Sequence, residues 1–182
     1  MNKNIKLALK HGAKIIPFKN LPKEYQYALI HYMAVDGEAW EASDQLAASY
    51  KVYWKKGDRS IIKRALRNKK SMEFYVTKYG DWKFGVADIP TEKIVSRIMQ
   101  EREIKKDFDS FPEYQKWAKG SAYWPRHPRK NRWPCILSSF NDEALEDGWS
   151  RFHVYSSRGD SNIPCVFYPN NCEPKKVRRK FT

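Results

Sequence analysis

The sequence lacks a long hydrophobic segment. No run of about 18 apolar residues occurs anywhere in the 182-residue chain, so no membrane-spanning helix is predicted. The first residues, MNKNIKLALK, carry charges but not the apolar stretch that a secretory signal peptide requires. We therefore expect a cytoplasmic protein with no membrane partner.

Cysteine is also scarce. The three cysteines do not have the spacing of a zinc site, and the four histidines are scattered along the chain. Cys135 and Cys165 fall inside apolar runs, which favours buried thiols in a reducing compartment. The sequence thus gives no support for a structural metal site of cysteine and histidine.

Acidic residues are few compared with basic ones. The chain has 35 lysines and arginines against 21 aspartates and glutamates, a net charge of +14. Such a surplus favours an anionic partner, DNA first, with RNA or an acidic protein surface as alternatives. Basic residues cluster at 51–70, at 126–132 and in the tail, and aromatic residues that could stack on bases lie beside the first two of these clusters. The predicted nucleic-acid contacts are Lys55, Lys56, Arg59, Lys63, Arg64, Arg126, Arg129, Lys130 and Arg132.

Periodicity divides the chain into three parts. Residues 1–70 are predicted to be a helical extension, 71–170 the core and 171–182 a basic tail. Within the core, the alternation of Met72, Phe74 and Val76 predicts a strand, paired as a hairpin with residues 82–86. Helices are then predicted from Pro90 to about residue 103 and over 105–120.

Residues 133–168 carry the most chemical information. They predict a strand, a turn at Asp147-Gly148, a helix that ends at Gly159 and a second strand. A glycine that opens a helix after a strand leaves free backbone N–H groups and the positive end of the helix dipole facing outward. This corner, residues 147–151, suits a phosphate, and the Arg151 guanidinium in the first turn of the helix could donate hydrogen bonds to it.

This ordered set resembles the nucleotide-binding motif of the ParB/sulfiredoxin superfamily. In that family a strand leads into Asp-Gly-x-His-Arg or a related turn, followed by a helix, a glycine and an Ile-Pro-Val strand. Here the match is Asp147 to Arg151, Gly159, and Ile163-Pro164-Cys165-Val166. The segments 86–94 and 133–136 are similar to other family strands, so the resemblance spans about residues 83–168.

Two departures from the family pattern matter. Ser150 stands where the family has histidine. The reactive cysteine of sulfiredoxin is absent from the turn, so peroxiredoxin repair is not expected.

The resemblance implies an α+β fold, with a mixed sheet, flanking helices and the N-terminal helical extension. It implies ATP or CTP with Mg²⁺, held at Gly148, Ser150 and Arg151. The implied catalytic residues are Asp147, Ser150, Arg151 and Glu92, the last by its position in kinase members of the superfamily.

A metal position can also be argued from the residues themselves. Asp147 and Glu143 would share one face of a regular strand and could hold the Mg²⁺. The alternative is that Asp147 only forms the turn.

Several functions follow from this sequence. The leading one is a nuclease or NTPase that acts on DNA. The alternatives are a nucleotide-gated DNA binder, a small-molecule kinase, and a non-catalytic inhibitor, encoded by a phage or plasmid, that binds nucleic acid or an acidic protein. Ser150 in place of histidine favours the non-catalytic alternative. No oligomeric state is predicted.

Overall fold

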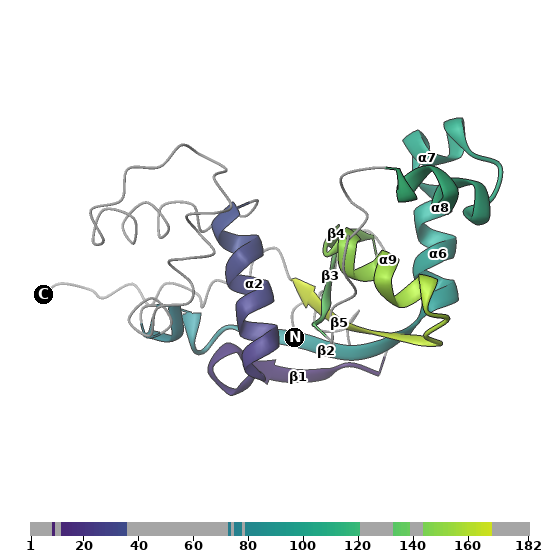
Figure 1. Ribbon diagram of the computed structural model, residues 1–182. Coiled ribbons are helices and arrows are strands. Elements are labelled where there is room, and N and C mark those ends of the chain that lie inside the picture. Colours follow the sequence, from purple (N-terminus) through teal and green to yellow (C-terminus); the bar gives the residue numbers. More distant parts are fainter. Residues whose placement is uncertain are drawn as a thin grey trace, which may run out of the picture. The chain divides into compact units, whose positions relative to one another are not determined.

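The computed structural model describes residues 9, 12–35, 73, 75–77, 79–120, 133–138 and 144–168. Figure 1 shows the elements that they form. In chain order these are β1 (Lys14–Pro17), the 3-10 helix η1 (Phe18–Asn20), α2 (Lys23–Val35), β2 (Lys83–Pro90), α6 (Thr91–Gln100), α7 (Arg102–Asp107), α8 (Phe111–Lys119), β3 (Cys135–Ser138), β4 (Leu145–Asp147), α9 (Trp149–Ser157) and β5 (Asn162–Tyr168).

The strands form one mixed sheet in the order β1-β2-β5-β3-β4. Strand β5 pairs antiparallel with β2 and parallel with β3, and β4 closes the series antiparallel to β3. The parallel β3–β5 pair requires a crossover, which β4 and α9 provide. A mixed sheet combined with helices places the protein in the α+β class, as the sequence predicts.

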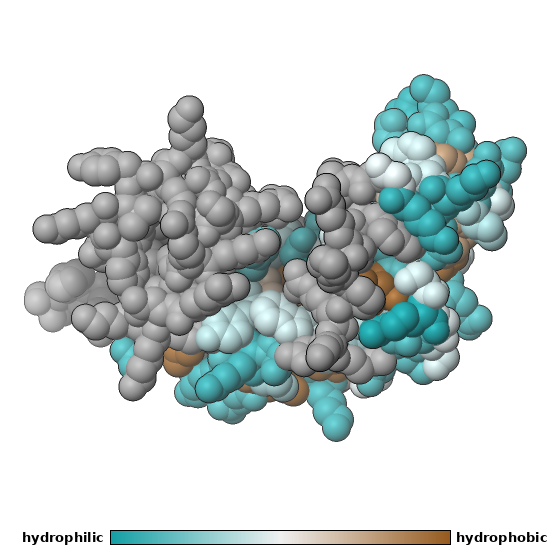
Figure 2. Space-filling view, viewed as in Figure 1, coloured by the Kyte–Doolittle hydropathy of each residue, from teal (hydrophilic) through white to brown (hydrophobic). Residues whose placement is uncertain are grey.

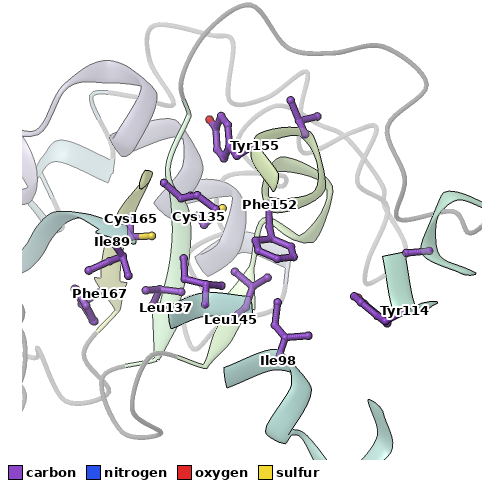
Figure 3. Close-up of a cluster of buried hydrophobic side chains, with 14 of the residues drawn as sticks. Ile89, Ile98, Tyr114, Cys135, Leu137, Leu145, Phe152, Tyr155, Cys165 and Phe167 are labelled. Carbon is purple, nitrogen blue, oxygen red and sulfur yellow. The ribbon is translucent and has the colours of Figure 1, made fainter. Parts of the chain in front are cut away.

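One face of the sheet packs against α6, α8 and α9 to form the core. Ile163, Cys165 and Phe167 alternate along β5 toward this face, as the two-residue period of a strand requires. Figure 3 shows strand and helix side chains meeting there. The helices add Ile94, Ile98, Tyr114, Ala118, Phe152, Val154 and Tyr155. Each fully buried large apolar side chain contributes about 1.5–3 kcal/mol.

The chain divides into two compact units. The first contains residues 1–16 and 84–171, and the second contains 17–83 and 172–182. Strand β1 belongs to the sheet although it lies in the predicted helical extension, because Ile15 and Ile16 are β-branched and favour extended backbone. The predicted boundary at residue 70 stays a prediction.

The second unit contains η1, α2 and a helical segment over described residues between 73 and 79. The predicted strand at 72–76 is wrong for those described residues. Tyr75 and Tyr79 lie one helical turn apart, both buried, and their rings stack at 5.9 Å. The Thr77 hydroxyl donates to the Glu73 carbonyl one turn back. Buried aromatic contacts at helical spacing thus outweigh the alternating pattern.

Three helices stand where two are predicted between residues 90 and 120. Helix α6 ends at Gln100 because Glu101 is extended, with φ −64° and ψ 131°. Phe108 is extended as well, and α8 then begins at Phe111 with Pro112 in its first turn. Among the described residues, no helix has the length and apolar character needed to cross a membrane.

Candidate functional site

Gly148 joins β4 to α9 in a left-handed conformation. Its φ is +96° and its ψ 22°, a region that glycine adopts without penalty. A Cβ at this position would lie 2.8 Å from Arg151 Nε and 3.1 Å from Cys135 Cα. Glycine is therefore required here for its backbone angle and for its space. The space that the sequence assigned to a phosphate is occupied by the protein's own guanidinium.

That guanidinium is bound to a carboxylate of the same corner. Arg151 Nη2 lies 2.8 Å from Asp147 Oδ2, and the two side chains are 9% and 20% exposed. At this degree of burial the charges attract each other more strongly than at the surface. Three of the predicted site residues, Asp147, Gly148 and Arg151, therefore meet, but as a mutually neutralising pair beside a glycine.

A β-bulge brings Asp147 to this place. Leu137 pairs with Leu145 whereas Ile136 pairs with Asp147, so Glu146 is the extra residue on β4. Leu145 lies in the core, and Asp147 is the partner of Ile136 and bonds to Arg151 of α9. The regular alternation predicted for Asp147 and Glu143 is interrupted by this bulge. Glu143 itself lies outside the described residues.

Cys135 packs against Gly148, and its thiol has low reactivity. Its Sγ lies 3.7 Å from the Gly148 carbonyl oxygen. Burial raises the pKa of the Cys135 thiol to about 12, and the nearby Arg151 charge opposes this only in part. The thiol therefore stays protonated and is a poor nucleophile. Cys135 and Cys165 are both free and buried, as predicted.

Glu92 is not brought to this corner. It lies exposed in the first turn of α6. The start of α6 is fastened near Gly159: the Thr91 N–H and hydroxyl donate to the carbonyls of Ser161 and Asp160. Helix α9, about 13 Å long at 1.5 Å per residue, separates this end from the Asp147 corner. Glu92 and Asp147 therefore do not form one catalytic set. Ser150, in the first turn of α9, is partly buried.

Glu101 lies closer to β4 than the sequence indicates. Burial raises the pKa of the Glu101 carboxyl, the Glu146 charge raises it further, and Arg97 opposes both. No local signal marks this residue, because the break between α6 and α7 contains neither glycine nor proline. Across the described ranges, no three or more histidine, cysteine, aspartate or glutamate side chains gather where they could hold a metal ion.

His153 is a packed side chain, as its position two residues past Arg151 predicts. It is 0% exposed, and its ring lies among those of Tyr114, Phe152 and Trp149, at centroid distances of 5.7, 5.4 and 6.5 Å. Burial lowers its pKa to about 4, so the ring is neutral at pH 7. It therefore packs at the α8–α9 contact.

The nine predicted nucleic-acid contacts all lie outside the described residues. The described part of the chain carries thirteen basic and thirteen acidic side chains and is neutral. The whole net charge of +14 therefore belongs to the remaining segments.

Comparisons of the chain with protein-family models, curated proteins and solved structures found no match. The ParB/sulfiredoxin resemblance accordingly stays a prediction from the motif.

Proposed function

We propose that the protein binds nucleic acid, DNA in the first place, without cutting it. The basic segments around residues 51–70 and 126–132 make the contacts, and the described residues, whose basic and acidic side chains balance, form the scaffold. The observation that carries this proposal is the distribution of charge: the described residues are balanced, and the surplus of +14 lies in the rest of the chain. Clustered lysines and arginines release counterions from a polyanion, which drives binding without sequence preference.

The corner at residues 147–151 supports a binder over a nucleotide enzyme. A nucleotide phosphate would have to displace the Asp147 carboxylate from Arg151, to which it lies at 2.8 Å. It would also have to enter the space above Gly148, where the guanidinium now lies. Ser150 in place of the family histidine points the same way. In this proposal the five-residue turn stabilises the fold.

Salt-dependent binding tests the main proposal. Fluorescence anisotropy with labelled duplex DNA, single-stranded DNA and RNA of equal length would give Kd between roughly 50 and 200 mM salt. We expect the affinity to fall by at least about 100-fold over this range, because several phosphates are contacted. Binding that is absent at low salt, or insensitive to salt, would refute the proposal.

A nucleotide-dependent nuclease or NTPase is the second candidate. The left-handed Gly148 and the first turn of α9, which has no side-chain cap, favour it. Plasmid DNA would be incubated with the protein, Mg²⁺ and either ATP or CTP. Nicking or nucleotide hydrolysis would favour this candidate, and retention of intact plasmid would favour the binder.

The Asp147→Asn variant sharpens that choice, because it removes the negative charge that competes for Arg151. If the corner holds a phosphate, this variant binds ATP or CTP more tightly than the wild type. If the corner is structural, neither protein binds the nucleotide.

A further inference from the structure

Two of the three cysteines lie side by side on interior strands of the sheet. Cys135 on β3 and Cys165 on β5 are register partners in the parallel pair. Both belong to the same buried cluster, so their side chains leave the sheet on the same face. Figure 3 shows both sulfur atoms within this cluster. Since the 182-residue chain has only three cysteines, the pairing of two of them favours a chemical role for the pair.

The spacing of neighbouring strands brings the two residues within disulfide range. Adjacent strands lie about 4.8 Å apart, and register partners face each other across that distance. A disulfide joins Cα atoms about 4.4–6.8 Å apart and Cβ atoms about 3.5–4.5 Å apart. The Cα atoms therefore fit, whereas side chains at the strand spacing hold the Cβ atoms slightly too far apart. A bond here would be strained, and strain makes a disulfide easier to reduce.

The Cys135 thiol contacts a different partner in the reduced protein. Its Sγ lies 3.7 Å from the carbonyl oxygen of Gly148. Gly148 follows β4, which lies on the opposite side of β3 from β5, so rotation of the Cys135 side chain would turn the sulfur toward Cys165. The Gly148 carbonyl would keep its hydrogen bond from the Phe152 N–H, at 2.8 Å. The rotation therefore leaves no buried acceptor without a donor.

Burial limits access to the pair. Both cysteines are 0% exposed, and on the face shown in Figure 2 the described surface is mostly hydrophilic. Because burial also keeps the Cys135 thiol protonated, oxidation is slow while the core is closed. Transient opening of the core would expose both thiols. Burial thus sets the rate of oxidation, whereas the register decides whether the bond fits the fold.

We propose that Cys135 and Cys165 form a reversible disulfide that locks β3 to β5 under oxidising conditions. The bond closes the crossover that contains β4, the corner at residues 147–151 and α9. The oxidant is a small disulfide such as glutathione disulfide. One cysteine thiolate attacks it and releases one glutathione thiol, and the other cysteine then displaces the second glutathione, so one S–S bond forms as another is reduced. This inference goes beyond nucleic-acid binding and does not depend on it.

Refolding in glutathione buffers tests the proposal at equilibrium. The Cys172→Ser variant removes the third thiol and leaves only the pair. It would be unfolded in urea and refolded in a series of reduced and oxidised glutathione mixtures, so that slow access to the core does not limit the reaction. We expect native circular dichroism, loss of both thiols, a mass lower by about 2 Da and a peptide that joins Cys135 to Cys165. Dithiothreitol should restore both thiols.

Urea denaturation of the reduced and oxidised forms tests the lock. The bond closes a loop over residues 135–165 and restricts the unfolded chain, so oxidation should raise the urea midpoint and reduction should reverse the rise. Cys135→Ala and Cys165→Ala, each with Cys172→Ser, are the matched controls. Alanine suits this row of the sheet, because Ala87 is the partner of Cys165 on β2. Neither control can form the bond, so neither should show the reversible rise.

Three outcomes would count against the proposal. Native protein that keeps both thiols reduced across the whole glutathione series would overturn it. A disulfide found only in protein without native circular dichroism would overturn it as well, since the bond would then belong to misfolded chains. An unchanged urea midpoint in the oxidised native protein would reject the lock.

Discussion

The described core and the basic segments differ in how their charges are balanced. Among the described residues, three ion pairs join opposite charges: Arg151 with Asp147, Arg158 with Asp160, and Lys19 with Asp81. Residues 51–70 contain nine cations and a single acid, Asp58. That segment cannot neutralise itself within its own sequence.

In the proposed function, the described residues provide stability and the basic segments provide binding. A neutral core avoids the self-repulsion that a uniform charge of +14 would impose on a compact state. In the proposed function, the cations in the rest of the chain bind an external polyanion. Substitutions in the two regions should therefore have separable effects, on unfolding in one case and on affinity in the other.

The largest effect is expected from Arg151→Met. This change leaves the Asp147 carboxylate mostly buried without its partner, which should lower the free energy of unfolding by about 3 kcal/mol. Urea denaturation at pH 7 measures the loss. Nucleic-acid affinity, expressed per folded molecule, should not change.

The control is the double variant Asp147→Asn with Arg151→Met, which removes both charges. It should recover part of the stability, because no uncompensated charge remains buried. Loss of nucleic-acid affinity in the folded single variant would contradict the separation of the two regions.

His153 should make the core sensitive to acid. Its folded pKa is about 4, below the ordinary value of 6.5, so the unfolded chain binds more protons between these values. The stabilisation is complete above about pH 6.5 and is lost as the pH falls toward 4, with about 2 kcal/mol lost at pH 5. Urea denaturation at pH 7 and pH 5 measures this difference.

The His153→Phe variant separates His153 from other titrating groups. It keeps an aromatic ring beside Tyr114 and Phe152 but cannot be protonated. Its stability should fall by about 2 kcal/mol less than that of the wild type between pH 7 and pH 5. A variant that loses as much stability as the wild type would assign the acid sensitivity elsewhere.

Residues 133–168 could be predicted from sequence because their signals are local. Gly148 and Gly159 bracket α9, and short apolar runs mark β3 and β5. The segment near residue 75 could not be predicted, since Tyr75 and Tyr79 fit a helix spacing while their neighbours alternate. The end of α6 at Gln100 is set by packing, as no helix-breaking residue stands there.

The role of the corner could be predicted only in part. The sequence shows a carboxylate and a guanidinium four residues apart, which can bind each other or a ligand. In the structure they bind each other at 2.8 Å, next to a register shift between β3 and β4. A register shift depends on contacts with β3, and no residue in the turn specifies it.

Neutralising basic residues tests whether the segment at residues 51–70 binds DNA. Replacing Lys55, Lys63 and Arg64 by glutamine should weaken DNA binding about tenfold at low salt and reduce the salt slope by up to about 3. Anisotropy titrations at several salt concentrations measure both, and the thermal midpoint should not change.

The matched control replaces three exposed cations of the described core, Lys14, Lys93 and Arg102, by glutamine. It changes net charge by the same amount but should alter affinity by less than about twofold. Equal losses in the two triple variants would mean that total charge, and not its location, governs binding.

The smallest effect is expected at the start of α6, where Thr91 bonds to the chain that follows the C-terminal end of α9. Thr91→Val keeps the side-chain shape but removes the hydroxyl that donates to the Asp160 carbonyl, so stability should fall by about 1 kcal/mol. Thr77→Val is the control, because the Thr77 hydroxyl makes an exposed bond within one helix, to the Glu73 carbonyl. Its loss should be less than about 0.5 kcal/mol, since water replaces the donor. Neither change should alter DNA affinity. If Thr91→Val weakened DNA binding as much as it weakened the fold, the start of α6 would belong to the binding surface, and the neutral core would be more than a scaffold.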